Sequence, residues 1–90
     1  MRLIFSETSW LDYLYWQEAD RAILERVNTL IKDTLRSPFI GIGKPEPLVG
    51  SLKGFWSRRI TQEHRFIYRV SGVGNLQSLE IAACRYHYLR

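Results

Sequence analysis

Four residues in the middle and at the end of this chain carry side chains suited to acid–base chemistry on a phosphodiester. Glu46 stands between two prolines, Arg59 and Arg65 flank a short turn, and His87 lies close to the end of the sequence. A carboxylate can accept a proton, an imidazole can donate one, and guanidinium groups can stabilise charge on phosphoryl oxygens. These four residues are therefore the first candidates for a functional site.

The two arginines carry more information than the glutamate or the histidine, since either of the latter can simply be solvated. If the hairpin loop between Arg59 and Arg65 has three or five residues, they become cross-strand neighbours on one face. Two guanidiniums placed in this way repel each other unless an anion lies between them. A phosphate gripped by both would remove the repulsion, and so would surface ion pairs with Glu46 or Glu63, which contribute little each. The spacing alone does not choose between these alternatives.

Several common catalytic and cofactor motifs are missing from the sequence. It contains no G-x-S-x-G segment, no P-loop and no dinucleotide-binding G-x-G-x-x-G followed by a helix. The two histidines, His64 and His87, and the single cysteine, Cys84, have no metal-ligand spacing. We interpret His64 as a turn residue, and we expect neither a metal nor an organic cofactor.

The positive charge is concentrated in the second half of the chain. The sequence has 13 Lys and Arg and 9 Asp and Glu residues, and residues 1–45 hold six of each kind. Residues 46–90 therefore hold seven basic and three acidic residues, which is the whole net charge of +4. A surplus confined to one half suggests a surface that faces a polyanion, and chance together with solubility is the plain alternative.

The length of 90 residues suits one small domain, spanning residues 1–90. So small a domain is only modestly stable, so we expect either an oligomer or a tightly bound partner. The composition does not distinguish between these two. The single cysteine excludes an intrachain disulfide and indicates a reducing compartment. The sequence shows neither an apolar run of membrane-spanning length nor a signal-peptide pattern after Met1. We expect a cytoplasmic protein that does not enter a membrane.

The order of secondary structure predicts an α+β fold. An apolar run at 3–5 and Ser6, a good N-cap residue, predict a strand followed by a helix over 7–18, whose aromatic residues we expect in the core. Asp20 caps a second, amphipathic helix that stops at Ser37-Pro38. Residues 38–54, rich in proline and glycine, predict a loop, and 55–60, 65–70 and 79–88 predict three strands. The result is a strand, two helices and a three-stranded antiparallel meander, with the helices packed on one sheet.

Along nearly its whole length the chain resembles the YoeB toxins of the RelE/ParE superfamily. The resembling segments, in order, are WLDYLYWQ (10–17), LIKDT (30–34), GKPEPL (43–48), GFWSRRIT (54–61), EHR (63–65) and IAACRYHY (81–88). A match of many segments in order is far more specific than one short motif. The resemblance implies a RelE-like fold and a small ribonuclease that enters the ribosomal A site, cleaves the mRNA there and arrests translation. It also implies that an antitoxin of the YefM type holds the toxin inactive, and we further expect a homodimer.

The resemblance also implies roles for individual residues. By position, the general base of the family is Glu46, the general acid is His87, the phosphate-binding arginines are Arg59 and Arg65, and the terminal tyrosine is Tyr88. We expect the neighbouring Lys44 and Arg58 to contact RNA phosphates as well. This chain departs from the family in having Val49 where a lysine is frequent, and in continuing past the tyrosine with Leu89-Arg90.

These roles predict a reaction that needs no metal, in which Glu46 takes the proton from a ribose 2′-OH and His87 protonates the leaving 5′-oxygen. The products would be a 2′,3′-cyclic phosphate and a 5′-hydroxyl. Two alternatives stay open at this point. The same scaffold could serve a toxin that binds a protein, as the gyrase inhibitors of the ParE branch do, although such a binder needs no acid–base pair. The protein could also be a nuclease that acts without the ribosome.

Overall fold

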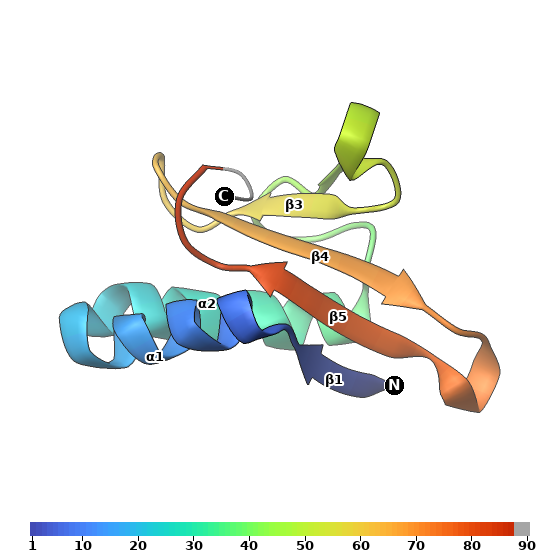
Figure 1. Cartoon of the computed structure of the whole chain (residues 1–90), viewed down its shortest axis with the longest axis horizontal. Coiled ribbons are helices and arrows are strands. Elements are labelled where there is room, and N and C mark those ends of the chain that lie inside the picture. Colours follow the sequence, from blue (N-terminus) through green and yellow to red (C-terminus); the bar gives the residue numbers. More distant parts are fainter. Residues whose placement is uncertain (88–90) are drawn as a thin grey trace.

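Two helices cover one face of a five-stranded mixed sheet in the computed structural model, which describes residues 1–87 (Figure 1). The elements in chain order are β1 (Arg2–Phe5), α1 (Glu7–Ala19), α2 (Arg21–Arg36), β2 (Glu46–Pro47), β3 (Trp56–Arg59), β4 (Arg65–Ser71) and β5 (Ser78–Ala83). Short 3₁₀ turns lie at Gly50–Leu52 and Gly74–Leu76. The α+β class and the packing of the helices on one sheet are confirmed. Within the described residues, neither helix combines the length and the apolar character that crossing a membrane requires.

The ends of both helices follow local signals in the sequence. Ser6 caps α1, because its Oγ accepts a hydrogen bond from the N–H of Ser9 over 3.1 Å. Asp20 caps α2 in the same way, with its carboxylate accepting from the N–H of Ile23 over 3.1 Å. The second helix ends two residues before Pro38, as predicted.

The strands are arranged in the order β1-β5-β4-β3-β2. The neighbours β3, β4 and β5 form the predicted antiparallel meander, and β1 adds to β5 in parallel at one edge. The other edge is β2, which pairs with β3. Strand β2 lies inside the segment 38–54 that the sequence predicts to be a loop. A strand of two residues is too short to show any periodicity, so the prediction missed it.

The last strand is shorter than predicted, because β5 ends at Ala83 and not at residue 88. The ladder is already irregular where β5 passes the Ile67/Tyr68 step of β4. Further along, Tyr86 has a φ of 67°, in the left-handed region that an extended strand does not use. The segment after β5 therefore curves toward the β3–β4 turn (Figure 1).

Alternation along the strands gives the sheet a helix side and an open face. On the helix side, Phe66, Tyr68, Leu79 and Ile81 pack with residues of α1 and α2 in the core. The register places the residues that alternate with them on the opposite side. We define the open face by these residues, which are Glu46, Phe55, Ser57, Arg59, Arg65, Ile67, Arg69 and Glu80. Ser57 and Ile67 in its middle are buried, whereas Glu46, Arg59 and Arg69 are exposed.

The aromatic residues of α1 are only partly in the core. Trp16 is buried against the sheet, as predicted, whereas Trp10 is 46% and Tyr15 41% exposed, so the expectation for these two residues was wrong. Trp10 lies near the start of α1, where its ring meets Phe5 edge-on at 5.5 Å and stacks on Tyr13 at 5.9 Å. These contacts leave much of the ring in solvent.

Candidate active site

Arg59 and Arg65 face each other directly across the β3–β4 hairpin. They are Cα partners in the ladder, and the loop between them is residues 60–64, one of the two lengths that bring them onto one face. Within residues 1–87, neither arginine forms an ion pair with a carboxylate. With Thr61 and Gln62 they line an open groove of about 630 Å³. Like charges placed opposite each other are destabilising, so this groove is suited to an anion.

The turn of the hairpin holds the guanidinium of Arg65 in place. Its Nη1 donates to the carbonyl oxygens of Thr61, Gln62 and His64 over 2.8, 3.1 and 3.1 Å. Its other terminal nitrogen, Nη2, has no hydrogen-bond partner among the described residues. A cation anchored on one side and open on the other is pre-organised to receive a phosphate, because little side-chain entropy is left to lose.

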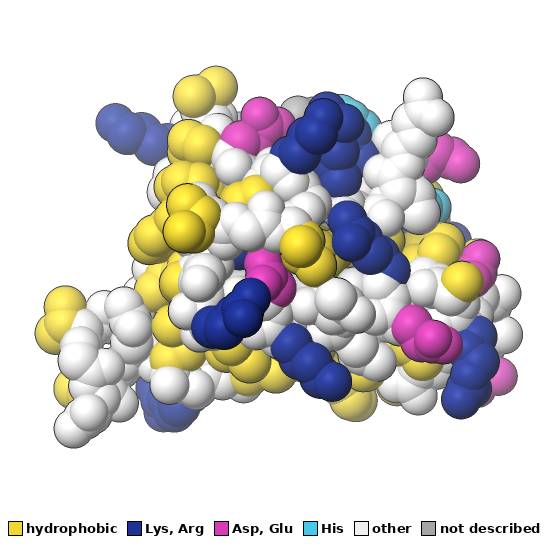
Figure 2. Space-filling model, turned by 180° about the vertical axis from the view of Figure 1, so that it is seen from behind, with side chains coloured by type: hydrophobic (Ala, Val, Ile, Leu, Met, Phe, Trp, Pro, Cys, Tyr) yellow, Lys and Arg dark blue, Asp and Glu magenta, His cyan; other side chains and the backbone are white. Residues whose placement is uncertain are grey.

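The strand β2 brings Glu46 to the same face. Glu46 is exposed and pairs with Ser57, which lies two residues before Arg59 in β3. Residues two apart in a strand face the same side, so Glu46 lies on the same face as the arginine pair, on the neighbouring strand. Lys44 is exposed and follows Gly43, whose carbonyl accepts from the N–H of Arg59 over 2.7 Å. Figure 2 shows a cluster of basic side chains at the upper centre of the view, with acidic and histidine side chains beside it, and further basic side chains across the lower part.

Two hydrogen bonds bring the predicted general acid to the arginines. The N–H of Arg65 donates to the carbonyl oxygen of Tyr86 over 2.8 Å, and the N–H of Tyr86 donates to Nδ1 of His64 over 2.8 Å. His87 is the next residue and is exposed. The bond to Nδ1 also requires the His64 tautomer with its proton on Nε2.

Contacts with α1 anchor the residues that precede His87. The carbonyl oxygen of Cys84 accepts a hydrogen bond from Nε1 of Trp16 over 2.8 Å. The N–H of Cys84 donates to the carboxylate of the buried Asp12 over 3.1 Å. The guanidinium of Arg85 lies 3.5 Å from the ring centroid of Tyr15. The segment is thus tied to the helix layer as well as to the hairpin.

Arg58 is absent from the groove, so the expectation that it binds a phosphate was wrong. Its side chain is fully buried, because alternation turns it to the helix side while its neighbour Arg59 faces the open side. Its guanidinium donates to Asp33 over 2.6 Å. It also donates to the hydroxyl of Tyr68 and to the carbonyls of Ser37, Ile40 and Ile42. Arg58 therefore holds the loop that leads to β2.

Asp33 is the anionic partner of this buried arginine. Hydrogen bonds from Arg58, from Arg36 and from the N–H of Ile42 lower the pKa of Asp33 from 3.8 to about 2. The bond to Arg58 links residues 25 positions apart. Nothing in the local sequence around Asp33 indicates it.

The structure thus brings Glu46, Arg59 and Arg65 together on the open face. Lys44 is exposed just before β2, and His87 directly follows Tyr86, which is hydrogen-bonded to Arg65. The remaining predicted site residue, Tyr88, lies outside the described residues. The sequence analysis missed the hydrogen bond that His64 makes with the segment before His87. The only signal that could have found it is the resemblance itself, which includes the segment at 63–65.

Comparisons with known proteins show which family the chain belongs to. The family described as "YoeB-like toxin of bacterial type II toxin-antitoxin system" matches residues 5–88. The chain belongs to the YoeB toxin family. Toxin YoeB of Escherichia coli (strain K12) is 64% identical over 88 residues, which cover 98% of this chain and all of the relative.

Solved structures of the family have the same fold. A YoeB/ParE toxin from Agrobacterium tumefaciens has 55% identity and a TM-score of 0.94 over 98% of this chain and all of that one. A YoeB dimer and a YoeB–YefM complex from Staphylococcus aureus have 39% and 38% identity and TM-scores of 0.86 and 0.85, each over 98% of both chains. This YoeB-family chain is therefore a toxin of a type II toxin–antitoxin system, with the helix layer and mixed sheet of its relatives.

Proposed function

We propose that this toxin is an endoribonuclease that cleaves mRNA in the ribosomal A site. The observation that carries the proposal is the directly opposed pair Arg59 and Arg65, without a described carboxylate partner, beside Glu46 on the same open face. A gripped phosphate accounts for two facing cations, and an acid–base pair beside it accounts for cleavage.

Each residue has one step in this reaction. Glu46 takes the proton from the ribose 2′-OH, whose oxygen attacks the adjacent phosphorus. Arg65 and Arg59 stabilise the charge that builds on the phosphoryl oxygens, and Lys44 adds a cation at the β2 side of the groove. His87 gives a proton to the departing 5′-oxygen, so the products are a 2′,3′-cyclic phosphate and a 5′-hydroxyl. Tyr88 completes the site on the strength of the family resemblance alone.

The partners of the relatives extend the proposal to this chain. The S. aureus YoeB has been solved as a dimer and in complex with YefM. By the same reasoning this toxin binds a YefM-type antitoxin and forms a homodimer. A cationic groove on the open face gives an acidic antitoxin segment a surface of opposite charge to cover.

The test compares RNA cleavage on programmed ribosomes with cleavage of naked RNA, using the wild-type protein and Glu46→Gln. We expect cuts in the A-site codon on ribosomes, 2′,3′-cyclic phosphate ends, and loss of most cleavage in the variant. Equal cutting of naked RNA would make the protein a ribosome-independent nuclease. Translation arrest or gyrase inhibition that persists in Glu46→Gln without any RNA cleavage would make it a protein-binding toxin.

A further inference from the structure

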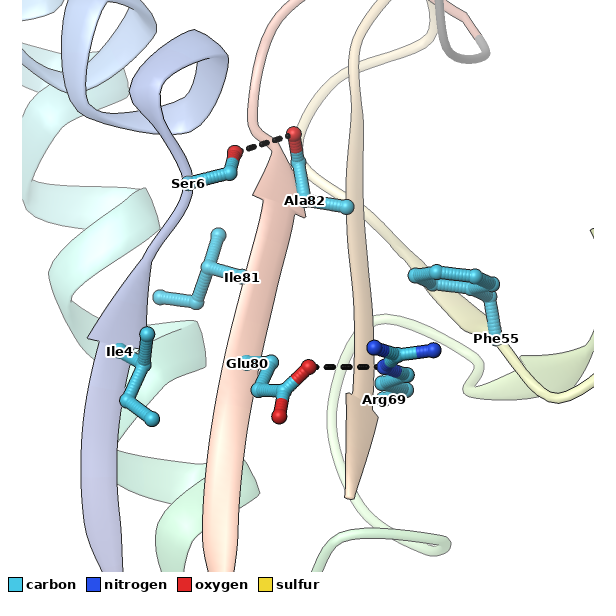
Figure 3. Close-up of a pocket in the computed structure, with 7 residues that line it drawn as sticks. All are labelled: Ile4, Ser6, Phe55, Arg69, Glu80, Ile81 and Ala82. Carbon is cyan, nitrogen blue, oxygen red and sulfur yellow. Dashed lines mark hydrogen bonds and ion pairs between the residues drawn. The ribbon is translucent and has the colours of Figure 1, made fainter. Parts of the chain in front are cut away.

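A second hollow lies on the open face, away from the arginine pair. It has a volume of about 380 Å³, in the lower part of the range for small-molecule pockets of roughly 300–1,000 Å³. Its lining residues include Ile4, Ser6 and Ala82 together with Phe55, Arg69 and Glu80. Ile81 borders it too, although Ile81 belongs to the core on the helix side. Figure 3 shows Arg69 between Glu80 and the Phe55 ring, with its guanidinium next to that ring. None of the roles proposed above uses these residues.

Arg69 is held as a flat, partly exposed platform. Its Nε donates to Glu80 over 2.7 Å, and its guanidinium carbon lies 5.1 Å from the ring centroid of Phe55. The side chain of Arg69 is still 49% exposed. A guanidinium that is oriented by a carboxylate and backed by an aromatic ring can stack on a second planar group from its free side.

Glu80 determines which kind of group the hollow can accept. Hydrogen bonds from Ser71 and from Arg69 keep the pKa of Glu80 below its ordinary value, so its carboxylate is charged at neutral pH. A carboxylate or a phosphate that entered the hollow would find the charge of Arg69 already balanced by this carboxylate. A neutral planar group needs no unbalanced charge, and the apolar wall would favour it.

The hollow lies in line with the proposed active site. The ladder pairs Trp56 with Tyr68 and Arg59 with Arg65, so Phe55 and Arg69 mark one end of β3–β4 and the arginine pair marks the other. The two ends are four residues apart, or about 13 Å at 3.3 Å per residue. Glu46, through its pairing with Ser57, lies at the level between them. An RNA strand that runs along β3 and β4 therefore passes the arginine pair first, then the level of the proposed general base Glu46, and then the hollow.

We propose that the hollow at Phe55 and Arg69 is a nucleobase subsite, which holds an RNA base on the 5′ side of the cleaved bond. The direction follows from the proposed function, on which this inference rests. His87 serves the leaving 5′-oxygen of the downstream nucleotide at the arginine end, whereas Glu46 serves the 2′-OH of the upstream nucleotide. The base stacks on the guanidinium of Arg69, and its phosphates stay outside, away from Glu80.

An RNA base fits this hollow better than an antitoxin segment does. The hollow shares its face with the groove that the proposed function assigns to RNA, so one strand can occupy both. An acidic peptide suits that groove, but its carboxylates do not suit a hollow that already contains Glu80. Sequence-tolerant stacking of bases on aromatic and arginine planes is common in proteins that bind single-stranded RNA.

The test is a double-mutant cycle between protein and RNA. Ribosomes are programmed with a message made uncleavable by a 2′-deoxy nucleotide at the attacked position, and toxin affinity is measured with an abasic nucleotide at each of the two positions 5′ of the cleaved bond. We expect one 5′ abasic position to weaken binding by roughly 5- to 150-fold. In Arg69→Gln that penalty should largely disappear, since the base has no guanidinium to stack on. In Phe55→Leu it should shrink, because Arg69 loses the ring that backs its guanidinium.

Two controls accompany the cycle. An abasic nucleotide on the 3′ side should show no coupling to Phe55 or Arg69, and Arg21→Gln, an exposed arginine at the start of α2, should keep the full 5′ penalty. An equal 5′ penalty in the wild type, Phe55→Leu and Arg69→Gln would overturn the subsite. Weaker antitoxin binding in these variants with unchanged RNA coupling would overturn it too, because it would assign the hollow to a peptide.

The cleavable message is assayed in parallel, so the two proposals can fail separately. Cleavage by the wild type without coupling would overturn the subsite alone. Coupling in the wild type without any cleavage would overturn the proposed function and leave a base-binding hollow in place.

Discussion

The main-chain N–H of Arg65 donates a hydrogen bond of 2.8 Å to the carbonyl oxygen of Tyr86, the residue directly before His87. The proposed phosphate ligand and the proposed general acid are therefore joined by the backbone, although Arg65 begins β4 and His87 lies beyond the end of β5. Any movement of the tail shifts the imidazole relative to the arginine pair. A partner that pulls the tail away could inactivate the toxin without touching the arginines.

Replacing His87 by Gln tests the general acid. We expect cleavage on programmed ribosomes to fall by about 10²–10⁴-fold, because protonation of the leaving group is lost. The side chain is exposed, so the free energy of unfolding and the antitoxin affinity should stay close to those of the wild type. Single-turnover cleavage together with thermal unfolding measures both. Cleavage at the wild-type rate would remove His87 from the mechanism.

The hydrogen bond between His64 and the Tyr86 N–H predicts a positioning role for a residue outside the groove. In His64→Leu the acceptor is lost, and the free energy of unfolding should fall by about 1 kcal/mol. We expect kcat to fall by tenfold or more with little change in KM, since the imidazole of His87 is displaced while the RNA contacts remain. A change in KM alone would show that His64 contributes to RNA binding instead. The two parameters are separated by steady-state kinetics on programmed ribosomes.

Arg58 and Arg36 both contact Asp33, so they form a matched pair for stability. Arg58→Met removes a fully buried partner and should lower the free energy of unfolding by about 3–5 kcal/mol. Arg36→Gln removes an exposed one, with 79% of its side chain accessible, and should cost less than about 1 kcal/mol. Urea unfolding of the two variants gives the comparison. Equal losses would contradict the assignment of Arg58 as the anchor of the loop before β2.

The lowered pKa of Asp33 predicts acid sensitivity. The group has a pKa of about 2 in the folded protein and 3.8 as its ordinary value, so the unfolded chain binds its proton first as the pH falls. The stabilisation from Asp33 is complete above pH 3.8 and is lost as the pH falls toward 2. Asp33→Asn should flatten this part of the stability curve, as followed by urea midpoints between pH 5 and 2. If the urea midpoints of Asp33→Asn fell with pH in parallel with those of the wild type, Asp33 would not be the source of the acid sensitivity.

The arginine pair predicts a salt dependence of RNA binding. Each phosphate contact releases counterions, so Arg59→Gln should reduce the slope of log affinity against log salt by about 1. Arg21→Gln, on the helix side, should leave that slope unchanged. Binding of an uncleavable message is measured at several salt concentrations for the three proteins. Identical slopes in the wild type and Arg59→Gln would place the phosphate elsewhere.

Much of the fold follows from the sequence because the deciding interactions are local. The caps at Ser6 and Asp20 and the proline at 38 act within one helical turn, so they define α1 and α2 without tertiary information. The loop length between Arg59 and Arg65 likewise restricts their register, and the ladder has them paired. The order of the three antiparallel strands follows from short connections between alternating runs.

The rest depended on contacts between distant parts of the chain. Two arginines in succession look alike in the sequence, but alternation places Arg58 inside and Arg59 outside, and only the position of the helix layer determines which is which. The partner of Arg58 is an aspartate 25 residues away. The path of the tail depends on Arg65 and His64, and β2 exists only because β3 pairs with it. The sequence therefore indicated the chemical groups of the site, and the packing of the sheet decided which of them share a face.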